Sequence, residues 1–576
     1  MWLLWTFVLL LGSALYKVGS NIIATADLYR AAKKTGLPIV ISPVDTRSAF
    51  WLITQKYIAP IIRGAPFGLG SWAGFTTRGW LWEGHEKMHQ KLGKVWVQVS
   101  PKRLDVYTAD VDMINQVYAR RKEFERDPEV KNYIPNLLQG SVSSVTGADW
   151  QRHRRITVPP FNEQNMGLVW AESLRQAAAL CEWWTGHAQG FNTSCVDTMT
   201  VALNVLATAG LGQSWRFTPA TSQHGKRPES SGDYSADYRD TMAILLSDMR
   251  ILSLMPNWLY SLDPTYVRLL PIPRAFREHL IAAKHFKMLM RQMVEERRAD
   301  FRAGKVKDNI FLNAMIAQSE ASAVEKGLGL TETEIFGNMF GYGVAGHETT
   351  AHTLNYTLHL LAAYPEWQEW IQSEVDQVYQ EIPVDTERID YAEYFPRLNR
   401  CLALMHEVLR LYPPVLEHNK QSLGSQGHDL RIDGREVHFP PDTVVHLNVI
   451  GCHLMSDYWG PDYREFKPSR WIKNEQTSSE VFCQPTDDKG AFFPWSSGAR
   501  NCPGKKFSQV EYVAIMSYVL RYQRVEAISL EGEMPEATRA RVWENTKDSE
   551  PEVTMNMRNP EKVRLRLVSR AVAPVV

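Results

Sequence analysis

The sequence FPWSSGARNCPG occupies residues 493–504 of a 576-residue chain. Its single cysteine, Cys502, follows a glycine, an arginine and an asparagine and precedes Pro-Gly. Residues 505–511 have the pattern of a helix start, so we expect Cys502 to lie in a tight loop at a helix N-terminus. The unpaired N–H groups and the dipole of a helix N-terminus stabilise a thiolate. The loop therefore favours a cysteine that acts as a ligand, against the alternative of a buried, inert thiol.

Composition describes a large globular protein without a global charge. Apolar residues make up 44% and charged residues 22% of the chain, and 64 basic residues balance 64 acidic ones. This balance gives the whole chain no electrostatic attraction to nucleic acid. The six cysteines form no CxxC pair, which argues against a zinc site and a disulfide framework and fits a reducing compartment.

The N-terminal region is apolar enough for a membrane anchor. Residues 1–24 can form one tilted span if Lys17 snorkels to the interface. Basic residues follow the span and none precedes it, which places the rest of the chain on the cytosolic side. The alternative is a cleaved signal peptide. We expect a retained transmembrane signal-anchor at 1–24, a linker at 25–50 and one large domain at 51–576.

Helical periodicity predominates from about residue 110, so the expected fold class is mainly α with a minor β-sheet portion. The expected helices cover residues 111–123, 168–186, 197–211, 237–252, 274–302 and 332–363. Alternating residues at 95–99 and 104–107 predict strands. Residues 219–237 resemble a mobile surface insertion in composition, and the apolar segment 251–260 breaks between two helices.

Within the expected helix 332–363, residues 341–350 contain three glycines, at 341, 343 and 346, each costing ~1 kcal/mol relative to alanine. A cofactor face, a substrate or tight helix packing would explain them. Glu348 and Thr349 place a carboxylate and a hydroxyl beside Gly346, which suits proton transfer.

Two other pairs have helical spacing. Glu407 and Arg410 share a helix face at i, i+3, and Trp150 and Arg154 do so at i, i+4. In isolation, Glu407 and Arg410 would be interpreted as a solvated ion pair. Trp150 and Arg154 would be interpreted as part of a basic surface helix.

Taken together, these motifs resemble the cytochrome P450 family. Residues 495–504 match its pattern Phe-x-x-Gly-x-Arg-x-Cys-x-Gly with Trp495 in place of Phe, and residues 345–350 match Ala/Gly-Gly-x-Asp/Glu-Thr-Thr. The family's Glu-Arg-Arg triad is matched by Glu407, Arg410 and Arg470. The motifs follow the family's order from Trp150 to Gly504.

The resemblance implies a role for each matched residue. Haem b would bind through its iron to Cys502, and the structural lock would consist of Glu407, Arg410 and Arg470. Thr349 and Glu348 would deliver protons as the catalytic pair. The implied haem contacts are Trp150, Arg154, Gly346, Trp495, Arg500 and, by an approximate match to a propionate-binding arginine, Lys420.

The resemblance also implies a cytochrome P450 fold with an N-terminal transmembrane anchor and a haem-thiolate monooxygenase domain at 51–576. Such an enzyme oxidises a lipophilic small molecule with O2 and electrons from NADPH-cytochrome P450 reductase, and it acts on the cytosolic face of the endoplasmic reticulum membrane. Arg152 and Arg155 would help to dock the reductase, with Lys505 and Lys506 extending the patch. The organisation looks like that of a fungal microsomal member acting in secondary metabolism.

Two rival functions remain open at this stage. One is a membrane haem-binding sensor or carrier without turnover. The other is a haem-thiolate isomerase or dehydratase that needs no external electrons, and the presence of the pair Glu348 and Thr349 argues against it.

Overall fold

The computed structural model describes residues 2–66, 70–126, 140–219, 234–247, 255–304, 310–324, 328–380, 389–474, 480–483 and 490–570. Its contacts divide the chain into two compact units. Unit 1 comprises Met1–Pro128, Arg410–Phe466 and Gln484–Cys502. Unit 2 comprises Glu129–Leu409, Lys467–Cys483 and Pro503–Val576.

Unit 1 is built on a six-stranded sheet with the order β1-β2-β3-β8-β5-β4. The strands are β1 (Ile39–Ile41), β2 (Val95–Val99), β3 (Leu104–Thr108), β4 (Phe124–Glu125), β5 (Glu417–Ser422) and β8 (Val444–Asn448). β1 pairs with β2 and β3 pairs with β8 in parallel, whereas the other neighbours are antiparallel. Every residue of β2, β3 and β8 is buried. The two strands expected from the sequence are confirmed as β2 and β3.

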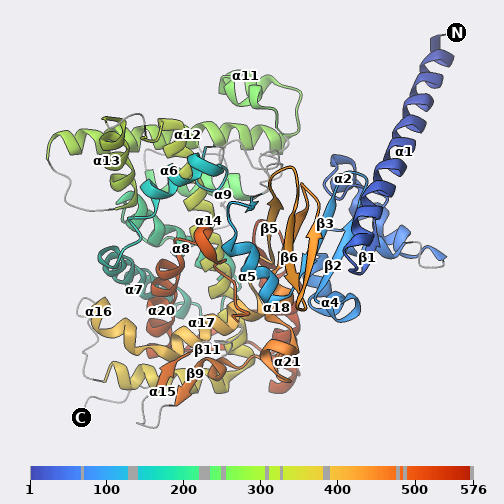
Figure 1. Ribbon diagram of the computed structural model, residues 1–576. Coiled ribbons are helices and arrows are strands. Elements are labelled where there is room, and N and C mark those ends of the chain that lie inside the picture. The colour runs from blue at the N-terminus through green and yellow to red at the C-terminus, as the bar shows by residue number, and fades with distance from the viewer. Residues whose placement is uncertain are drawn as a thin grey trace. The chain divides into compact units, whose positions relative to one another are not determined.

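Helices and a hairpin complete unit 1. They are α1 (Trp2–Lys34), α2 (Ala49–Arg63), η2 (Ser71–Phe75), α3 (Trp80–Gly84), α4 (Lys87–Leu92), α5 (Val111–Ala119), β6 (His428–Ile432), β7 (Arg435–Phe439), α18 (Val449–His453), α19 (Ser456–Trp459) and η9 (Gly498–Arg500). Figure 1 shows α1 extending well beyond the sheet of unit 1.

The expectation of a linker at 25–50 is wrong in part. α1 continues to Lys34, β1 pairs with β2, and Ser48 caps α2 by accepting a hydrogen bond from the backbone N–H of Trp51. Ala32 is fully buried in the core of unit 1. Backbone pairing and this burial give order to a segment in which Gly36, Pro38 and Ser42-Pro43 indicated a connection.

Unit 2 is mainly helical. Its helices are α6 (Gly147–Thr157), α7 (Glu163–Thr185), α8 (Ser194–Leu211), α9 (Tyr234–Ser247), η5 (Asn257–Ser261), α11 (Pro264–Leu269), α12 (Arg274–Arg302), α13 (Phe311–Val324), α14 (Glu332–Ala363), α15 (Pro365–Val378), α16 (Tyr391–Tyr394), η7 (Phe395–Arg397), α17 (Asn399–Leu411, whose last two residues belong to unit 1), η8 (Pro468–Trp471), α20 (Lys505–Tyr522), α21 (Pro535–Lys547) and η10 (Pro560–Lys562). Three antiparallel strand pairs complete it: β9 (Ile472–Asn474) with β10 (Glu480–Phe482), β11 (Gln523–Ala527) with β14 (Leu565–Ser569), and β12 (Ser549–Pro551) with β13 (Met555–Met557).

Helix α14 is the central element of unit 2, since it packs against α8, α20 and α21. Thr331 and Glu334 form a reciprocal capping box at its start, which fixes where the helix begins. The bounds of α14 and α12 are those predicted from periodicity. The expected helix 111–123 is shorter, because α5 ends at Ala119. Residues 220–233 and 248–254 of the other predicted segments lie outside the described residues.

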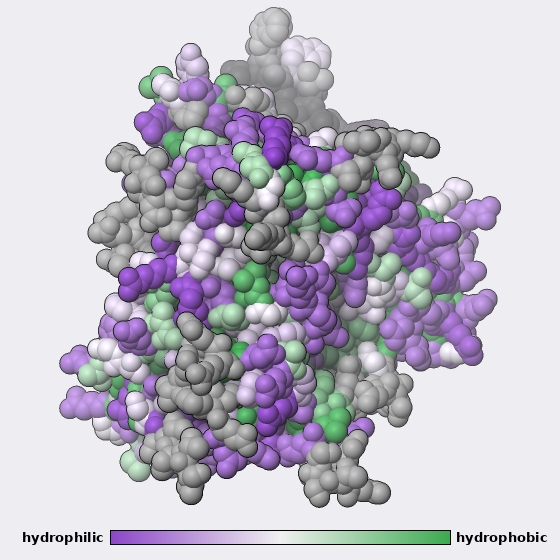
Figure 2. Space-filling model, turned by 90° about the vertical axis from the view of Figure 1, so that its left-hand side faces the viewer, coloured by the Kyte–Doolittle hydropathy of each residue, from purple (hydrophilic) through white to green (hydrophobic). Residues whose placement is uncertain are grey.

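Two observations concern contact with water or lipid. Among the described side chains, those of α8 alone make a helix long and apolar enough to cross a membrane, and 78% of its apolar window is buried inside the structure, as in a core helix. On the face of unit 2 drawn in Figure 2, hydrophilic residues predominate and hydrophobic ones are scattered among them. That face therefore fits contact with water.

The buried side chain of His446 on β8 links β8 to both of its neighbouring strands in unit 1. The ring nitrogens of His446 on β8 lie 3.0 Å from Asp105 of β3 and 3.0 Å from Glu417 of β5. The ring stacks on Tyr107, with centroids 4.2 Å apart. Burial opposes the charge, but Glu417 and Asp105 overcome this and raise the pKa of His446 to about 9.

We predict that His446→Gln lowers the free energy of unfolding by ~3 kcal/mol at pH 6. Because the folded-state pKa is raised, this contribution is complete below the ordinary pKa of 6.5 and is lost as the pH rises through about 9. Urea unfolding at pH 6 and pH 10 would measure both values. The matched control is His438→Gln, since His438 lies 2.7 Å from Asp429 but is 59% exposed. Equal losses at the two positions, or a loss at His446 that does not change with pH, would contradict the prediction.

Candidate functional site

The loop before Cys502 is held by its own backbone. The N–H of Cys502 donates to the carbonyl of Trp495 at 2.8 Å, and the N–H of Ser496 donates to the carbonyl of Phe493 at 3.0 Å. Ser496 and Gly498 have left-handed φ angles of 61° and 69°. A Cβ at Gly498 would lie 2.7 Å from the carbonyl oxygen of Tyr118, so this position requires glycine. The loop leaves the thiol of Cys502 exposed, and α20 begins three residues later, as predicted.

Aromatic contacts support the same loop. Trp495 packs edge-on against Phe492, with ring centroids 6.1 Å apart. The N–H of Phe493 donates to Nε2 of His453 at 3.0 Å. Trp495 therefore packs against an aromatic neighbour within unit 1.

Three cations gather around one carboxylate in unit 1. Arg500 Nε lies 2.9 Å from Glu125 Oε1, and both side chains are 10% exposed. Burial, followed by the nearby Arg500, lowers the pKa of Lys420 to about 8; Arg126 acts in the same direction and Glu125 opposes the shift. Unit 1 therefore brings Arg500 and the predicted Lys420 together with Arg126. Sequence reasoning missed Glu125 and Arg126, because a two-residue strand leaves no periodic signal.

In unit 2, α14 presents the predicted pair. Glu348 is 5% exposed and accepts a hydrogen bond of 3.5 Å from the hydroxyl of Thr554, a residue that sequence reasoning did not connect with it. Burial raises the pKa of Glu348 to about 7, and the nearby Glu552 adds to this shift. Thr349 donates to the carbonyl of Ala345 at 2.7 Å. A carboxyl group that gains and loses its proton near neutral pH suits proton transfer.

Helix packing explains two glycines of α14. A Cβ at Gly346 would lie 3.2 Å from Leu206 of α8, and one at Gly343 would lie 3.2 Å from Met242 of α9. The lack of a side chain at Gly346 therefore lets the neighbouring helix α8 pack closely. It gives no support to a haem contact there.

On α6, the structure agrees with one expectation and corrects another. Trp150 is buried, and the guanidinium of Arg154 lies 5.7 Å from its ring centroid, so the two share one helix face as expected. Arg152 was expected to dock a redox partner, but it pairs with Glu334 and donates to the carbonyl of Gly329 at 2.8 Å. This ion pair corrects that expectation for Arg152, whereas Arg155 is exposed.

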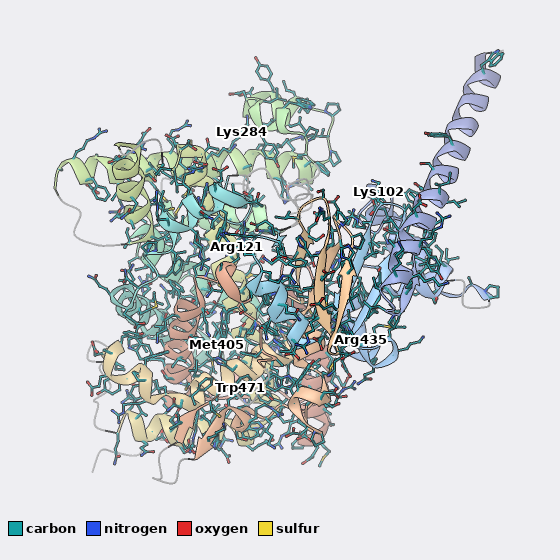
Figure 3. The ribbon with its side chains drawn as sticks, viewed as in Figure 1. Lys102, Arg121, Lys284, Met405, Arg435 and Trp471 are labelled. Carbon is teal, nitrogen blue, oxygen red and sulfur yellow. The ribbon has the colours of Figure 1, made fainter. Side chains whose placement is uncertain are left out.

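Glu407 is the buried acceptor of a network in unit 2. Its carboxylate is fully buried and accepts from the N–H of Lys467 at 2.9 Å, from Arg470 Nε at 3.0 Å and from the indole of Trp471 at 3.0 Å. Figure 3 labels Trp471 below Met405, a residue of the same helix as Glu407. The expected link between Glu407 and Arg470 is thus present.

Arg410 has a different set of partners, in unit 1. Its guanidinium donates to the carbonyls of His453 at 3.1 Å and Glu465 at 3.0 Å and also to that of Tyr463. It lies 5.1 Å from the ring centroid of Trp459. Arg410 is fully buried and cross-links several backbone segments.

Comparison with known protein families matches residues 65–547 to the cytochrome P450 family. The chain therefore belongs to the cytochrome P450 family. It is 28% identical to a cytochrome P450 monooxygenase of Arthrobotrys oligospora over 94% of each chain. It is 30% identical to one of Penicillium roqueforti, over 86% of this chain and 87% of that protein. A monooxygenase of the phomenoic acid biosynthesis cluster of Leptosphaeria maculans is 26% identical, over 87% of this chain and 89% of that protein.

The family implies an enzyme of the monooxygenase class that contains haem iron with an axial cysteine. The residues of unit 1 fit such a group. Cys502 presents an exposed thiol on the family's loop, and Arg500, Lys420 and Arg126 outnumber the single carboxylate of Glu125. This positive excess matches the two propionates that haem carries.

We predict that Glu407→Gln lowers the free energy of unfolding by ~3 kcal/mol, because Arg470 is left buried without its counter-charge. The control is Glu544→Gln, since Glu544 forms a 2.6 Å ion pair with Lys547 and is 67% exposed. We expect a change below ~0.5 kcal/mol there. Denaturant midpoints would measure both variants, and similar values would show that the network around Glu407 contributes no more than a surface ion pair.

Proposed function

We propose that this protein is a membrane-anchored haem-thiolate monooxygenase that oxidises a lipophilic small molecule with O2 and electrons from NADPH-cytochrome P450 reductase. The observation that carries the proposal is the exposed Cys502 thiol on a loop of the family pattern, with a net positive cluster in the same unit. When bound, thiolate-ligated haem supplies the oxidising chemistry by favouring cleavage of the O–O bond.

The chain's own residues bind, orient and supply protons. Cys502 would provide the sulfur ligand, and Arg500 and Lys420 would hold the propionates. The resemblance to the family also assigns haem contacts to Trp150 and Arg154. The reaction consumes two protons with two electrons, and water must be kept from the reacting carbon. Glu348, with a pKa of about 7, and Thr349 beside it supply these protons.

The membrane anchor is proposed from exposed apolar side chains of unit 1. Trp5, Tyr16, Ile22 and Ile23 of α1 are between 63% and 80% exposed. On α2, an apolar stripe at helical spacing is also exposed, comprising Phe50, Ile53, Tyr57 and Ile61. A membrane would cover both surfaces, with residues 1–24 as a single span of the endoplasmic reticulum membrane and the catalytic domain in the cytosol.

The proposed pathway is secondary metabolism, which is supported by the relative from the phomenoic acid biosynthesis cluster. For the reductase, Arg155 and Lys505 remain as exposed cations of the predicted docking patch. By position relative to the family, substrate contacts are proposed for Tyr133, Ile134 and Leu138, for residues 340–344 and 415–416, and for a turn near residues 553–555. Of these, Tyr133, Ile134 and Leu138 lie outside the described residues, and Phe340 packs in the core against Phe286.

The axial ligand can be tested spectroscopically. We expect the reduced protein to show, with carbon monoxide, the red-shifted Soret band of thiolate ligation, and Cys502→Ala to abolish it. Cys483→Ala is the matched control, since this partly exposed cysteine should leave the band unchanged. Persistence of the band in Cys502→Ala would refute the assignment.

Turnover tests the function and the role of Glu348. With reductase present we expect NADPH consumption coupled to product formation, and its absence would favour a sensor, a carrier or an isomerase.

The protonated fraction of Glu348 falls as the pH rises through about 7, so coupling should decline between pH 6 and pH 8. Glu348→Gln should lower coupling about 10-fold or more and remove this pH dependence.

A matched control exists for that variant. Burial also raises the pKa of Glu374 to about 7, but this carboxylate accepts hydrogen bonds from the backbone N–H groups of Arg400 and Cys401. Glu374→Gln should keep the wild-type pH profile of coupling. The same flat profile in both variants would mean that loss of a buried carboxyl, and not of Glu348 in particular, is responsible.

The anchor can be tested by deletion of residues 2–24. Full-length protein should require detergent for release from membranes, because α1 spans the bilayer. The truncated protein should be released by high pH or salt, because the stripe of α2 binds the surface alone. Adding Ile53→Ser and Ile61→Ser should make it soluble, and a truncated protein that still needs detergent would contradict the proposed span.

A further inference from the structure

The hairpin β12–β13 follows the axis of α14 in unit 2. Ser549 at the start of β12 shares a hydrogen bond of 2.7 Å with the hydroxyl of Tyr356. Thr554, before β13, donates to Glu348 at 3.5 Å. Tyr356 and Glu348 are eight residues apart on α14, or ~12 Å along a helix. Two hydroxyl contacts thus fix the hairpin so that its turn lies at Glu348.

This turn leads from solvent to a buried carboxyl. Glu552 is exposed, and its N–H donates to the carbonyl of Thr554 at 3.0 Å. Its carboxylate accepts from Asn556 at 3.2 Å, which keeps the side chain on the hairpin. The Thr554 side chain is buried, as is that of Glu348. Exposure therefore falls from Glu552 to Thr554 and Glu348.

Three other titratable groups near Glu348 are uncharged near neutral pH. Burial lowers the pKa of His347 and His352 on α14 to about 4. Burial, followed by the nearby Glu561, Glu348 and Glu552, raises the pKa of Cys195 on α8 to about 12. Since these groups carry no charge at pH 7, the charge of Glu552 and the hydroxyl of Thr554 are the influences that can tune Glu348 among the described groups.

We propose that Glu348 exchanges protons with solvent through the turn formed by Glu552, Val553 and Thr554. A proton from water passes to the carboxylate of Glu552 and then, through the hydroxyl of Thr554, to Oε2 of Glu348. O–H bonds alone form and break, and no oxidant or reductant is needed. Thr554 is a positioning residue, and the inference rests on the proposed role of Glu348 in proton delivery.

The test is an infrared pH titration of the haem-loaded, full-length enzyme. The C=O stretch of protonated Glu348 is identified as the band lost in Glu348→Gln. In Thr554→Val the apparent pKa of Glu348 should rise by about half a unit or more, because a donor to the carboxylate is lost. In Glu552→Gln it should fall by about as much, because a like charge is removed. A purely structural role would not shift the pKa in opposite directions.

Three variants serve as controls. Thr554→Ser keeps the hydroxyl and should retain the wild-type pKa. Thr200→Val makes the same change at a buried threonine of α8 that donates to the carbonyl of Val196, and it should shift nothing. Glu550→Gln removes a carboxylate of the same hairpin that pairs with Arg558 at 3.4 Å, and it should shift the pKa less than Glu552→Gln.

Failure of the inference and failure of the proposed function give different results. Unchanged Glu348 titration in both Thr554→Val and Glu552→Gln would overturn the inference, even if the wild type turns over with reductase. Opposite pKa shifts in an enzyme that consumes no NADPH would support the route to Glu348 and refute the monooxygenase function. With both correct, Thr554→Val should also release several-fold more hydrogen peroxide per NADPH than Thr200→Val.

Discussion

The approach of Gly498 to the carbonyl oxygen of Tyr118 is the constraint on which the cysteine loop depends. A side chain at position 498 would lie 2.7 Å from that oxygen, so the chain can turn here because glycine has no Cβ and accepts a left-handed φ. The turn lets Arg500 reach Glu125 and leaves the thiol of Cys502 exposed. A ligand of the haem iron is therefore positioned by a backbone contact with the end of α5.

Three carboxylates of unit 2 perform different tasks, and their surroundings decide which. Burial raises the pKa of Glu334, but Arg152 and the N–H of Thr331 overcome this and lower it to about 2, so this carboxylate is a permanent charge that fixes the start of α14. Glu407 has three donors and serves as a structural acceptor. Glu348 has one long hydrogen bond and a neighbouring carboxylate, so its charge is poorly stabilised. Poor stabilisation is what makes a proton exchangeable near neutral pH.

The sequence was sufficient to predict the structure where one local pattern determined it. The apolar periods and the capping box at Thr331 determine α14, and the order of residues before Cys502 determines the loop. It was insufficient where partners come from distant parts of the chain. Arg152 looked like a surface cation because Glu334 lies far away in sequence, and Gly346 looked like a cofactor contact because Leu206 of another helix was not visible. Glu125 was missed because it lies in no periodic segment or motif, whereas the turn at Thr554 was expected near the substrate and its contact with Glu348 was not foreseen.

Helix α1 and the sheet of unit 1 are mechanically continuous. Ala32 is buried in the core and Leu28 packs against it, while β1 adds to the sheet five residues after the helix ends. On the proposed placement of residues 1–24 in the bilayer, the ten remaining residues of the helix would form a stalk of ~15 Å that ends close to the sheet. Such a stalk would act as a lever, because a change in the tilt of the membrane span, for example in a thicker bilayer, would be passed on to the sheet.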